Sequence, residues 1–310
     1  MSDLKDKGFS VREIESLKAD GCSYAEDIVE VMRFTREEAF ESGKTGFFFM
    51  PNKITYSRPT ASLEDVLEGL GRSKRKRIRK AMNSLGDLEF VTERPITQES
   101  YTEWHRKLYV PGMESRSRGL VIARPDWWKA GKPGSERFGL FFRKNGEIVA
   151  GIMARSFRKD GLLPERFSIS FSAVREDLRR TGINDYLNAL TIDYARKCGY
   201  GYISRGRDTN LYGLHLSAGI PVYKISLGFD INPDRKSPDI LIRFNRPENL
   251  DTIFFVSYNR DMSLCGNLIA AGKVSRQEAG EYMCGTVKEI RVFRKTGNEI
   301  RLVERASARA

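Results

Sequence analysis

The pattern of apolar and polar residues in the second half of the chain predicts a strand, a helix and further strands. Apolar side chains alternate with serines along residues 166–173, as in a half-buried strand. From residue 183 the apolar spacing changes to three and four, which places these residues on one face of a helix. The next strands are expected at residues 200–204 and 239–244. The helical stripe consists of Ile183, Leu187, Leu190 and Tyr194.

Two hairpins are predicted from turn residues between apolar runs. Asn145-Gly146 separates the runs at residues 138–142 and 147–154, and both turn residues tolerate positive φ. Near the end of the chain, alternating segments at residues 288–294 and 299–304 surround a second turn. Both pairs are therefore expected to form antiparallel strands.

The first half of the chain predicts short strands and helices. Residues 23–33 have a helical apolar spacing, and residues 46–58 have the pattern of two short strands broken near residue 51. A helix is expected at residues 97–109, with its large apolar side chains turned inward. Those side chains are Tyr101, Trp104 and Leu108. Helix starts are marked by Ser62-x-x-Asp65 and Ser275-x-x-Glu278.

Residues 72–80 carry the densest run of basic side chains. Apolar residues spaced three or four apart give this segment one helical face, and the basic side chains take the rest. Like charges on one short helix repel one another, and a bound polyanion relieves that repulsion. Arg75 and Arg77 are therefore candidate anion-binding residues. The alternative is a solvated helix surface.

Composition and charge bound the class of protein. With 310 residues and 40% hydrophobic content, the chain can bury sizeable cores. The net charge of +12 fits a polyanionic partner such as RNA or a nucleotide-bearing donor, or simply a basic surface. Four scattered cysteines and two histidines argue against a metal site or a disulfide framework. The charged start and the lack of an apolar run of about 20 residues predict a cytoplasmic protein without a membrane span.

Composition changes twice along the chain. A Gly/Pro/Lys-rich break covers residues 129–135, and the pattern changes again after Pro247. We therefore expect three regions, at residues 1–130, 131–246 and 247–310. The last region contains the terminal hairpin. Its role is open between an oligomer contact, a lid and an added edge of the sheet. The oligomeric state is open as well.

The loop between the predicted strand and the helix at residue 183 is a candidate site for phosphate or a developing oxyanion. A helix start leaves backbone N–H groups without helical partners, and the helix dipole adds partial positive charge there. Both features favour anions. The alternative is a surface turn in which Gly182 only satisfies the helix geometry. The loop consists of Arg179, Arg180, Thr181, Gly182, Ile183 and Asn184.

The order of these elements resembles the GNAT acyltransferase superfamily, and the first half resembles its Fem-type branch. The resemblance covers residues 54–244. It implies an α/β (α+β) fold of two GNAT-like halves, with mixed, mostly antiparallel central sheets flanked by helices. It rests on Ser73-Lys74-Arg75-Lys76-Arg77-Ile78-Arg79-Lys80-Ala81 before Leu88-Glu89-Phe90, on the Arg-x-x-Gly-x-Asn loop, and on Tyr223-Lys224 with Gly228-Phe229.

The resemblance implies an N-acyltransferase that moves an acyl or aminoacyl group from an activated donor to an amine. The donor is then acyl-CoA, an acyl carrier or aminoacyl-tRNA, and no tightly bound cofactor is expected. The acceptor is an amine-bearing small molecule or peptide. Asn184 stands where the family usually has a small residue, and its side chain narrows the approach of a pyrophosphate to the backbone.

Candidate catalytic residues follow from the chemistry of amine attack on an ester or thioester. Lys224 can stabilise the oxyanion or a phosphate, and Tyr223 or Tyr212 can protonate the leaving group. Asp208 can orient the amine or accept its proton, and His215 is the alternative base. The alternatives are a solvated lysine, tyrosines that only pack, and an aspartate that caps a helix.

Arg205 and Arg207 are two residues apart, so on a strand they share a face and are candidates for binding an anionic acceptor or donor phosphates. His105 and the three tryptophans are expected to have structural roles. The rival hypothesis is a non-catalytic nucleic-acid-binding protein on a GNAT-like scaffold, which predicts salt-dependent RNA binding without turnover.

Overall fold

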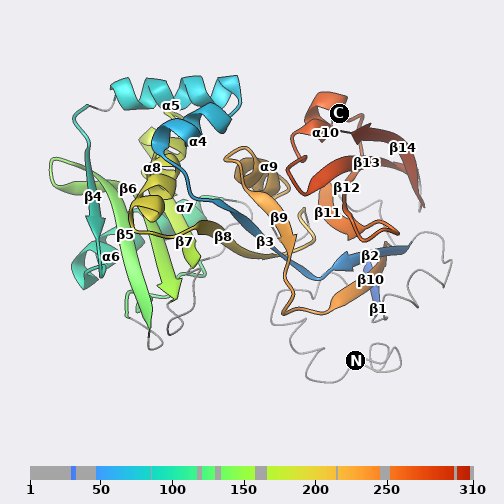
Figure 1. The fold of residues 1–310 in the computed structure, drawn as a ribbon, viewed down its shortest axis with the longest axis horizontal. Coiled ribbons are helices and arrows are strands. Elements are labelled where there is room, and N and C mark those ends of the chain that lie inside the picture. Colours follow the sequence, from blue (N-terminus) through green and yellow to red (C-terminus); the bar gives the residue numbers. More distant parts are fainter. Residues whose placement is uncertain are drawn as a thin grey trace. The chain divides into compact units, whose positions relative to one another are not determined.

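The chain folds into two compact units that are each built from separate stretches of sequence (Figure 1). The computed structural model describes residues 29–32, 47–84, 86–116, 121–129, 134–157, 166–213, 216–244, 252–296 and 299–307. We call the two parts the middle unit and the flanking unit, after their places in the sequence. The middle unit comprises Tyr56–Gly206 and Ser226–Phe229, and the flanking unit comprises Met1–Thr55, Arg207–Ile225 and Asp230–Ala310.

A mostly antiparallel sheet forms the centre of the middle unit. Its strands are hydrogen-bonded in the order β4-β5-β6-β7-β8, and only β7 and β8 are parallel. Strand β4 precedes residue 130 and pairs with β5, which follows it, so the middle unit spans the boundary expected there. The chain divides into two units made of separate stretches, whereas the sequence led us to expect three consecutive regions. The bounds are β4 Glu89–Glu93, β5 Ser135–Lys144, β6 Glu147–Phe157, β7 Arg166–Val174 and β8 Tyr202–Thr209.

The hairpin between β5 and β6 confirms the Asn-Gly prediction. Asn145 and Gly146 have φ values of 50° and 82°, the left-handed conformation that the two-residue turn requires. The pairing extends from Lys144–Glu147 at the turn to Ser135–Phe157 at the far end, with one irregularity near Phe142. The strand predicted at residues 166–173 and the helix predicted from residue 183 are confirmed as well.

Helices cover both faces of this sheet (Figure 1). On one face, Phe138 and Phe167 of the sheet pack with Tyr194 of α8. Helices α4 and α5 in turn pack against α8. The opposite face carries α6, η2 and α7. The bounds are α4 Leu63–Gly69, α5 Arg72–Ser84, α6 Gln98–Trp104, η2 His105–Tyr109, α7 Val110–Glu114, η3 Glu176–Leu178 and α8 Ile183–Lys197.

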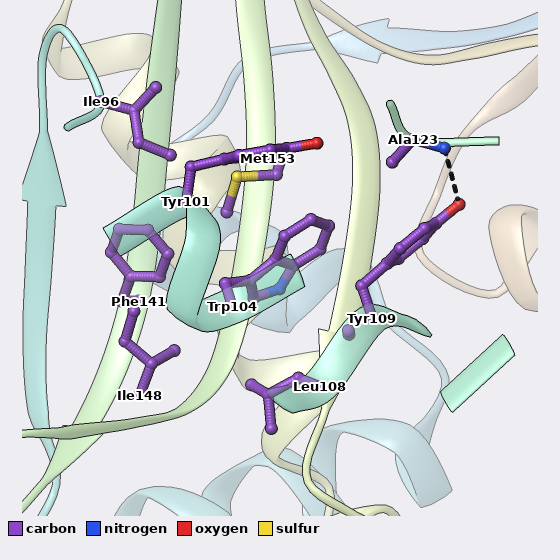
Figure 2. Packing of buried hydrophobic residues seen from close by; sticks show 10 residues of the cluster. Ile96, Tyr101, Trp104, Leu108, Tyr109, Ala123, Phe141, Ile148 and Met153 are labelled. Carbon is purple, nitrogen blue, oxygen red and sulfur yellow. Dashed lines mark hydrogen bonds between the residues drawn. The ribbon is translucent and has the colours of Figure 1, made fainter. Parts of the chain in front are cut away.

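The α6 face holds an aromatic core, seen in Figure 2. Tyr101, Trp104 and Leu108 are buried, as the sequence predicts, although the second half of this helix is a π-helix, η2. The indole of Trp104 donates a hydrogen bond of 3.2 Å to the carbonyl of Gly151. A Cβ on Gly151 would lie 2.6 Å from the Trp104 ring, so the strand must carry a glycine there. Truncating a buried tryptophan of this kind costs about 3–5 kcal/mol.

The flanking unit contains two smaller sheets, with strand orders β1-β10-β2 and β11-β12-β13-β14. The two strands predicted in residues 46–58 and the terminal hairpin are confirmed. Ser275 and Glu278 form the predicted reciprocal cap at the start of α10. The bounds are β1 Val29–Met32, β2 Phe47–Pro51, α9 Gly219–Ile225, β9 Asp230–Pro233, β10 Asp239–Phe244, β11 Ile253–Tyr258, β12 Leu264–Ala270, α10 Arg276–Gly280, β13 Val287–Thr296 and β14 Glu299–Ser307.

Strand β1 corrects the sequence prediction of a helix at residues 23–33. Val29–Met32 is extended and pairs antiparallel with Leu241–Phe244 of β10. The hydrogen-bond partners of this segment lie about two hundred residues away in the sequence, and that pairing overrides the local apolar spacing.

Strands β3 (Lys53–Pro59) and β9 extend the larger sheet beyond β8, in the order β8-β3-β9. Strands β3 and β8 each contribute residues to both units.

The described residues contain no cluster of histidine, cysteine, aspartate and glutamate that can hold a metal ion. Cys198, Cys265 and Cys284 are free thiols. None of the helices described here combines the length and the apolar composition that a bilayer crossing needs.

Candidate functional site

Strands β7 and β8 pair over only three residues. The parallel register joins Arg166 to Tyr202 and ends with Ser168 opposite Ser204. Both strands are described beyond this point, β7 to Val174 and β8 to Thr209, without further mutual pairing in the register. Backbone and side-chain polar groups between the separating strands therefore need other partners.

The side chain of Arg205 spans the separation. It projects from β8 towards α8 and lies almost entirely out of solvent, with 9% of its surface exposed. Its Nη1 atom donates a hydrogen bond of 2.5 Å to Asn188 Oδ1 on α8, and its Nη2 atom donates one of 3.3 Å to Ser172 Oγ on β7. A guanidinium thus links the two strands and the helix at the point where the sheet opens.

Two basic residues of α5 lie at the start of α8. The carboxylate of Asp185, in the first turn of α8, pairs with Arg77 and lies 3.5 Å from the ammonium of Lys74. Lys74 also donates a hydrogen bond to the hydroxyl of Ser226. A negative side chain at this helix end is favoured by the helix dipole. We call Lys74, Arg77, Asp185 and Arg205 the α5–α8 charge cluster.

Burial lowers the pKa of Lys74 below its ordinary value of 10.5. The neighbouring Asp185 raises it, and the positive charges of Arg77 and Arg205 lower it further. Three cations and one carboxylate leave a net positive charge; Lys74, Asp185 and Arg205 are largely shielded from solvent, and about half of the Arg77 side chain is exposed. Such a cluster favours an anionic ligand or a developing negative charge.

Gly182 lies directly before α8 and is buried against α5. Its φ is +90°, and a Cβ there would lie 2.7 Å from Arg77 Cγ and 2.9 Å from the Arg77 carbonyl oxygen. The predicted helix start is therefore confirmed, and a glycine is required because α5 approaches the backbone so closely. The first turn already holds one carboxylate, that of Asp185. Phosphate binding by this loop stays a prediction.

The other residues of the predicted donor loop have varied surroundings. Arg179 reaches Ser115 Oγ at 3.3 Å and Glu176 at 3.8 Å, and Thr181 Oγ1 donates to the carbonyl of Leu178. Arg180 is exposed, Ile183 is fully buried, and the carbonyl of Asn184 accepts a 2.6 Å hydrogen bond from Asn188.

The predicted arginines divide into two groups. Arg77 and Arg205 both lie close enough to Lys74 to lower its pKa, so the structure brings them together. Arg75 instead donates to the carbonyls of Glu68 and Leu70, which holds the turn between α4 and α5. Arg207 belongs to the flanking unit, where it pairs with Asp234 at 3.0 Å.

The flanking unit brings the predicted catalytic residues Asp208 and Lys224 together. Lys224 Nζ lies 2.5 Å from Asp208 Oδ2, and the hydroxyl of Tyr212 donates a hydrogen bond of 2.8 Å to the same oxygen. Lys224 lies on α9 and is buried, next to the half-buried Tyr223. We call Asp208, Tyr212 and Lys224 the α9 triad. The groove expected between the Gly182 turn and Tyr223-Lys224 stays a prediction, because the two places belong to different units.

His105 and the three tryptophans were expected to have structural roles, and His215 was the alternative to Asp208 as the base. His105 is buried, and its Nε2 atom lies 2.9 Å from the carbonyl oxygen of Ala123. Trp104, Trp127 and Trp128 belong to or pack against the aromatic core of the α6 face. His215, the alternative base, lies outside the described residues.

The outer side of α5 carries an exposed basic surface. No ion pair within the described part of the chain involves its four solvent-facing cations, and the first turn of the helix contains no acidic residue. The opposite side of the helix buries Ile78 and Ala81. We call this surface the basic face of α5; it consists of Arg72, Lys76, Arg79 and Lys80.

Sequence reasoning did not single out Lys74, Ser172, Asn188 or Ser226. For Lys74 a signal exists, since it lies four residues before Ile78 and thus on the apolar face of α5. A lysine at such a position is expected to be buried and to need a partner. The other three are polar residues whose role depends on the separation of β7 and β8, which local patterns do not encode.

No family model matches the chain, and no curated protein matches it. Among solved structures, FemX is similar with 11% identity, 75% of this chain and 69% of that chain covered, and a TM-score of 0.44. The C-terminal domain of a putative lysylphosphatidylglycerol synthetase from Agrobacterium fabrum is similar with 12% identity, coverage of 74% and 70%, and a TM-score of 0.40. An aminoglycoside acetyltransferase from an uncultured soil metagenomic sample has 14% identity, coverage of 39% and 75%, and a TM-score of 0.30. Because the identities and TM-scores are low, we derive function from the chain's own geometry.

Proposed function

We propose that this protein is an N-acyltransferase that moves an acyl or aminoacyl group from an activated donor to an amine. The observation that supports it best is the parallel pair β7–β8, which separates after three residues and has the α5–α8 charge cluster on the α8 side of the opening. Acyl transfer to an amine needs positive charge where the tetrahedral oxyanion forms and where donor phosphates bind. The cluster supplies net positive charge, and its members Lys74 and Arg205 are largely shielded from water.

Within the middle unit, Arg205 and Arg77 are proposed to bind anionic groups of the donor. Hydrogen bonds to Asn188 and Ser172 hold the Arg205 guanidinium in the opening between the strands. Burial lowers the pKa of Lys74, so this ammonium gives up its proton more readily than an exposed lysine does. The loop from Arg179 to Asn184 is proposed to complete the donor site.

The α9 triad is proposed to handle proton transfer. Asp208 would accept the proton of the attacking amine or orient it, and Lys224 would stabilise negative charge on the reacting carbonyl. Tyr212 already donates its hydroxyl proton to Asp208, so Tyr223 is the better donor to the leaving group. The contacts of Asp208 with Lys224 and with Tyr212 support the roles proposed for Asp208 and Lys224.

The basic face of α5 favours a donor that carries many phosphates. Aminoacyl-tRNA fits this surface, and acyl-CoA or an acyl carrier fits the charge cluster alone. The acceptor is proposed to be an amine-bearing small molecule or peptide, and a cytoplasmic setting fits the free thiols.

A second candidate is a non-catalytic RNA-binding protein, and the same basic face supports it. Both candidates predict binding to RNA whose affinity falls steeply with salt. They differ in turnover, because only the transferase forms a new amide bond.

The test is an assay for amide formation. The protein is incubated with donors labelled in the acyl group, acyl-CoA in one arm and aminoacyl-tRNA in the other, together with a panel of amines. The transferase predicts an amide whose mass contains the acyl group, and RNase abolishes it only if the donor is aminoacyl-tRNA. Binding of RNA without any amide product would favour the second candidate.

A further inference from the structure

The hydroxyl of Ser226 lies against the ammonium of Lys74. Lys74 Nζ contacts Ser226 Oγ on one side and lies 3.5 Å from the carboxylate of Asp185 on the other. All three residues belong to the middle unit. A hydroxyl and an amine in such a contact can exchange a proton, and a serine paired with a lysine base is one of the recurring forms of an activated nucleophile.

The surroundings of Lys74 make its amine a better base than they would leave an ordinary charged lysine. Only 12% of its side chain is exposed, and burial is the main cause that lowers its pKa below 10.5. Asp185 raises this pKa, and the positive charges of Arg77 and Arg205 lower it further. Because the net shift is downward, more of Lys74 is neutral at a given pH than of an exposed lysine. Only the neutral amine can accept the proton of a serine.

The backbone around Ser226 is fixed, although Ser226 itself is only half-buried. The side chains of Leu227 and Phe229 are fully buried. Arg58 of β3 donates a hydrogen bond of 2.6 Å to the carbonyl of Leu227. A Cβ on Gly228 would lie 2.7 Å from Arg58 Nη1, so the chain passes close to this arginine. A hydroxyl that solvent can reach, on a backbone held in place, suits a nucleophile.

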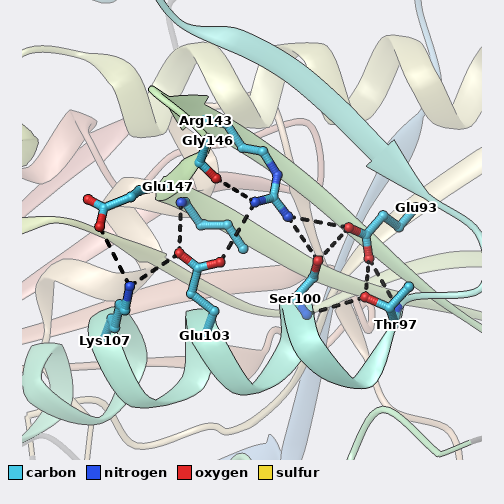
Figure 3. Close-up of polar contacts among 9 residues, drawn as sticks. Glu93, Thr97, Ser100, Glu103, Lys107, Arg143, Gly146 and Glu147 are labelled. Carbon is cyan, nitrogen blue, oxygen red and sulfur yellow. Dashed lines mark hydrogen bonds and ion pairs between the residues drawn. The ribbon is translucent and has the colours of Figure 1, made fainter.

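Ser100 shows how a serine with a structural role is held in the same unit (Figure 3). Its hydroxyl donates a hydrogen bond of 2.5 Å to Glu93 and accepts one of 2.9 Å from Arg143. The residue is buried, and an arginine does not lose its proton in a protein, so Arg143 cannot act as a base. Ser226 differs in both respects, because solvent reaches it and its cationic partner is a lysine.

We propose that Ser226 is a nucleophile that takes up the acyl group of an activated ester or thioester, with Lys74 as its general base. Ser226 Oγ attacks the acyl carbonyl carbon, and neutral Lys74 Nζ takes the hydroxyl proton. The bond from the carbonyl carbon to the oxygen or sulfur of the donor then breaks. The donor leaves with the proton that Lys74 held, and the acyl group stays on Ser226 as an ester.

The second step returns Ser226 to its starting state. An amine attacks the serine ester and forms the amide, the bond to Ser226 Oγ breaks, the amine loses a proton and Ser226 gains one. Arg77 and Arg205, which both lie near Lys74, supply positive charge for the oxyanions of the two steps. This inference deepens the proposed function and rests on it for the natural donor, but the serine ester itself forms without any amine.

The experiment therefore looks for the ester in the absence of amines. p-Nitrophenyl acetate is the probe, because it is an activated ester with a coloured leaving group. It reacts with the protein at a pH of about 9, below the ordinary pKa of lysine, and mass spectrometry of peptides locates the acetyl groups. Hydroxylamine cleaves esters and leaves amides intact, which separates acetylated serine from acetylated lysine.

Four variants accompany the wild type. Ser226→Ala removes the nucleophile, and Lys74→Met removes the base. Lys74→Arg keeps the positive charge and hydrogen-bond donors at that position but cannot accept a proton. The matched control is Ser73→Ala, which removes an exposed serine of α5 next to Lys74.

We expect a burst of p-nitrophenolate from the wild type, together with a hydroxylamine-sensitive acetyl group on Ser226. Ser73→Ala should behave like the wild type, and Ser226→Ala should give no burst. Lys74→Met and Lys74→Arg should each form the ester at least about a hundredfold more slowly. The burst rate of the wild type should rise with pH as Lys74 loses its proton, and more steeply than that of Lys74→Arg.

The wild type alone can overturn the proposal, whatever the variants do. It is overturned if the wild type has no hydroxylamine-sensitive acetyl group on Ser226, or if Lys74 carries the acetyl group as an amide instead. Formation of the ester in Lys74→Arg at the wild-type rate overturns it as well, because the lysine is then only a structural partner.

Failure of this proposal differs visibly from failure of the proposed function. Amide formation from an acyl donor and an amine, with no ester on Ser226, leaves the transferase in place and overturns the serine intermediate. An ester on Ser226 that reacts only with water supports the nucleophile and contradicts the transferase.

Discussion

Substituting Gly182 by alanine tests how closely α5 packs on the start of α8. The new Cβ would lie 2.7 Å from Arg77 Cγ and 2.9 Å from the Arg77 carbonyl oxygen, and the second of these atoms belongs to the backbone. A flexible side chain can move aside, but a carbonyl of α5 cannot move without shifting the helix. The variant therefore has to displace α5, which carries Lys74 and Arg77, from α8.

The expected loss in free energy of unfolding has two parts. Alanine at a φ of +90° adopts a left-handed conformation, which costs about 1–2 kcal/mol. Forcing extra volume into a packed contact adds about 1–3 kcal/mol. We therefore expect Gly182→Ala to lower the free energy of unfolding by about 2–5 kcal/mol, taking both parts together.

The assay is urea denaturation followed by circular dichroism, with Gly199→Ala as the matched control. Gly199 follows the other end of α8 with a φ of +84°, and a Cβ there would meet no atom within 4 Å. The control therefore has the conformational cost without the packing cost, and it should lose about 1–2 kcal/mol. Equal losses in the two variants would refute the close contact between α5 and α8.

Three further predictions concern charge. Burial lowers the pKa of Lys74 in the folded state, so the unfolded chain binds more protons than the folded chain as the pH approaches 10.5. The free energy of unfolding of the wild type should therefore rise with pH in that range, and it should rise less steeply in Lys74→Met. Identical slopes of this free energy against pH in the two proteins would contradict the burial of Lys74. Lys224→Ala should lower turnover about 10²–10³-fold with little change in donor affinity, whereas Lys236→Ala, at an exposed position, should not; unchanged turnover would remove Lys224 from the site. Changing Lys76 and Arg79 to glutamate should reduce the salt dependence of RNA binding measured by filter retention. An unaltered slope of log affinity against log salt concentration would show that the basic face of α5 does not contact the RNA.

Local signals in the sequence predicted much of the fold. Asn145-Gly146 adopts the conformation that its turn needs, and Ser275 with Glu278 caps its helix as the spacing indicates. The helix from residue 183 also forms, because apolar periodicity and a preceding glycine agree there. In each case the determining interactions lie within a few residues of one another.

The parts that depend on distant contacts were not predicted. Val29–Met32 becomes a strand because β10 supplies its hydrogen bonds. The middle unit joins β4 to β5 across a Gly/Pro/Lys-rich break that the composition suggested as a boundary. Composition marks where a chain has no regular structure, but it does not show whether the strands on either side pair.

The roles of the candidate site residues stay predictions, but the structure shows which of them lie together. Asp208 lies 2.5 Å from Lys224, and Arg77 and Arg205 both lie near Lys74. Arg75 and Arg207 have local partners instead. Lys74 escaped notice although its place four residues before Ile78 indicates burial, and its contact with Asp185 of α8 depends on tertiary packing, which a single sequence does not display.

The most direct measurement is the rate of amide formation in a single turnover, compared between the wild-type protein and Arg205→Met. Methionine keeps much of the buried volume while removing the charge that lies between β7 and β8. If this charge cluster serves acyl transfer, the wild type forms the amide and the variant, still folded, forms it at least about a hundredfold more slowly. An equal rate in the variant, or no amide from either acyl-CoA or aminoacyl-tRNA, would contradict the account.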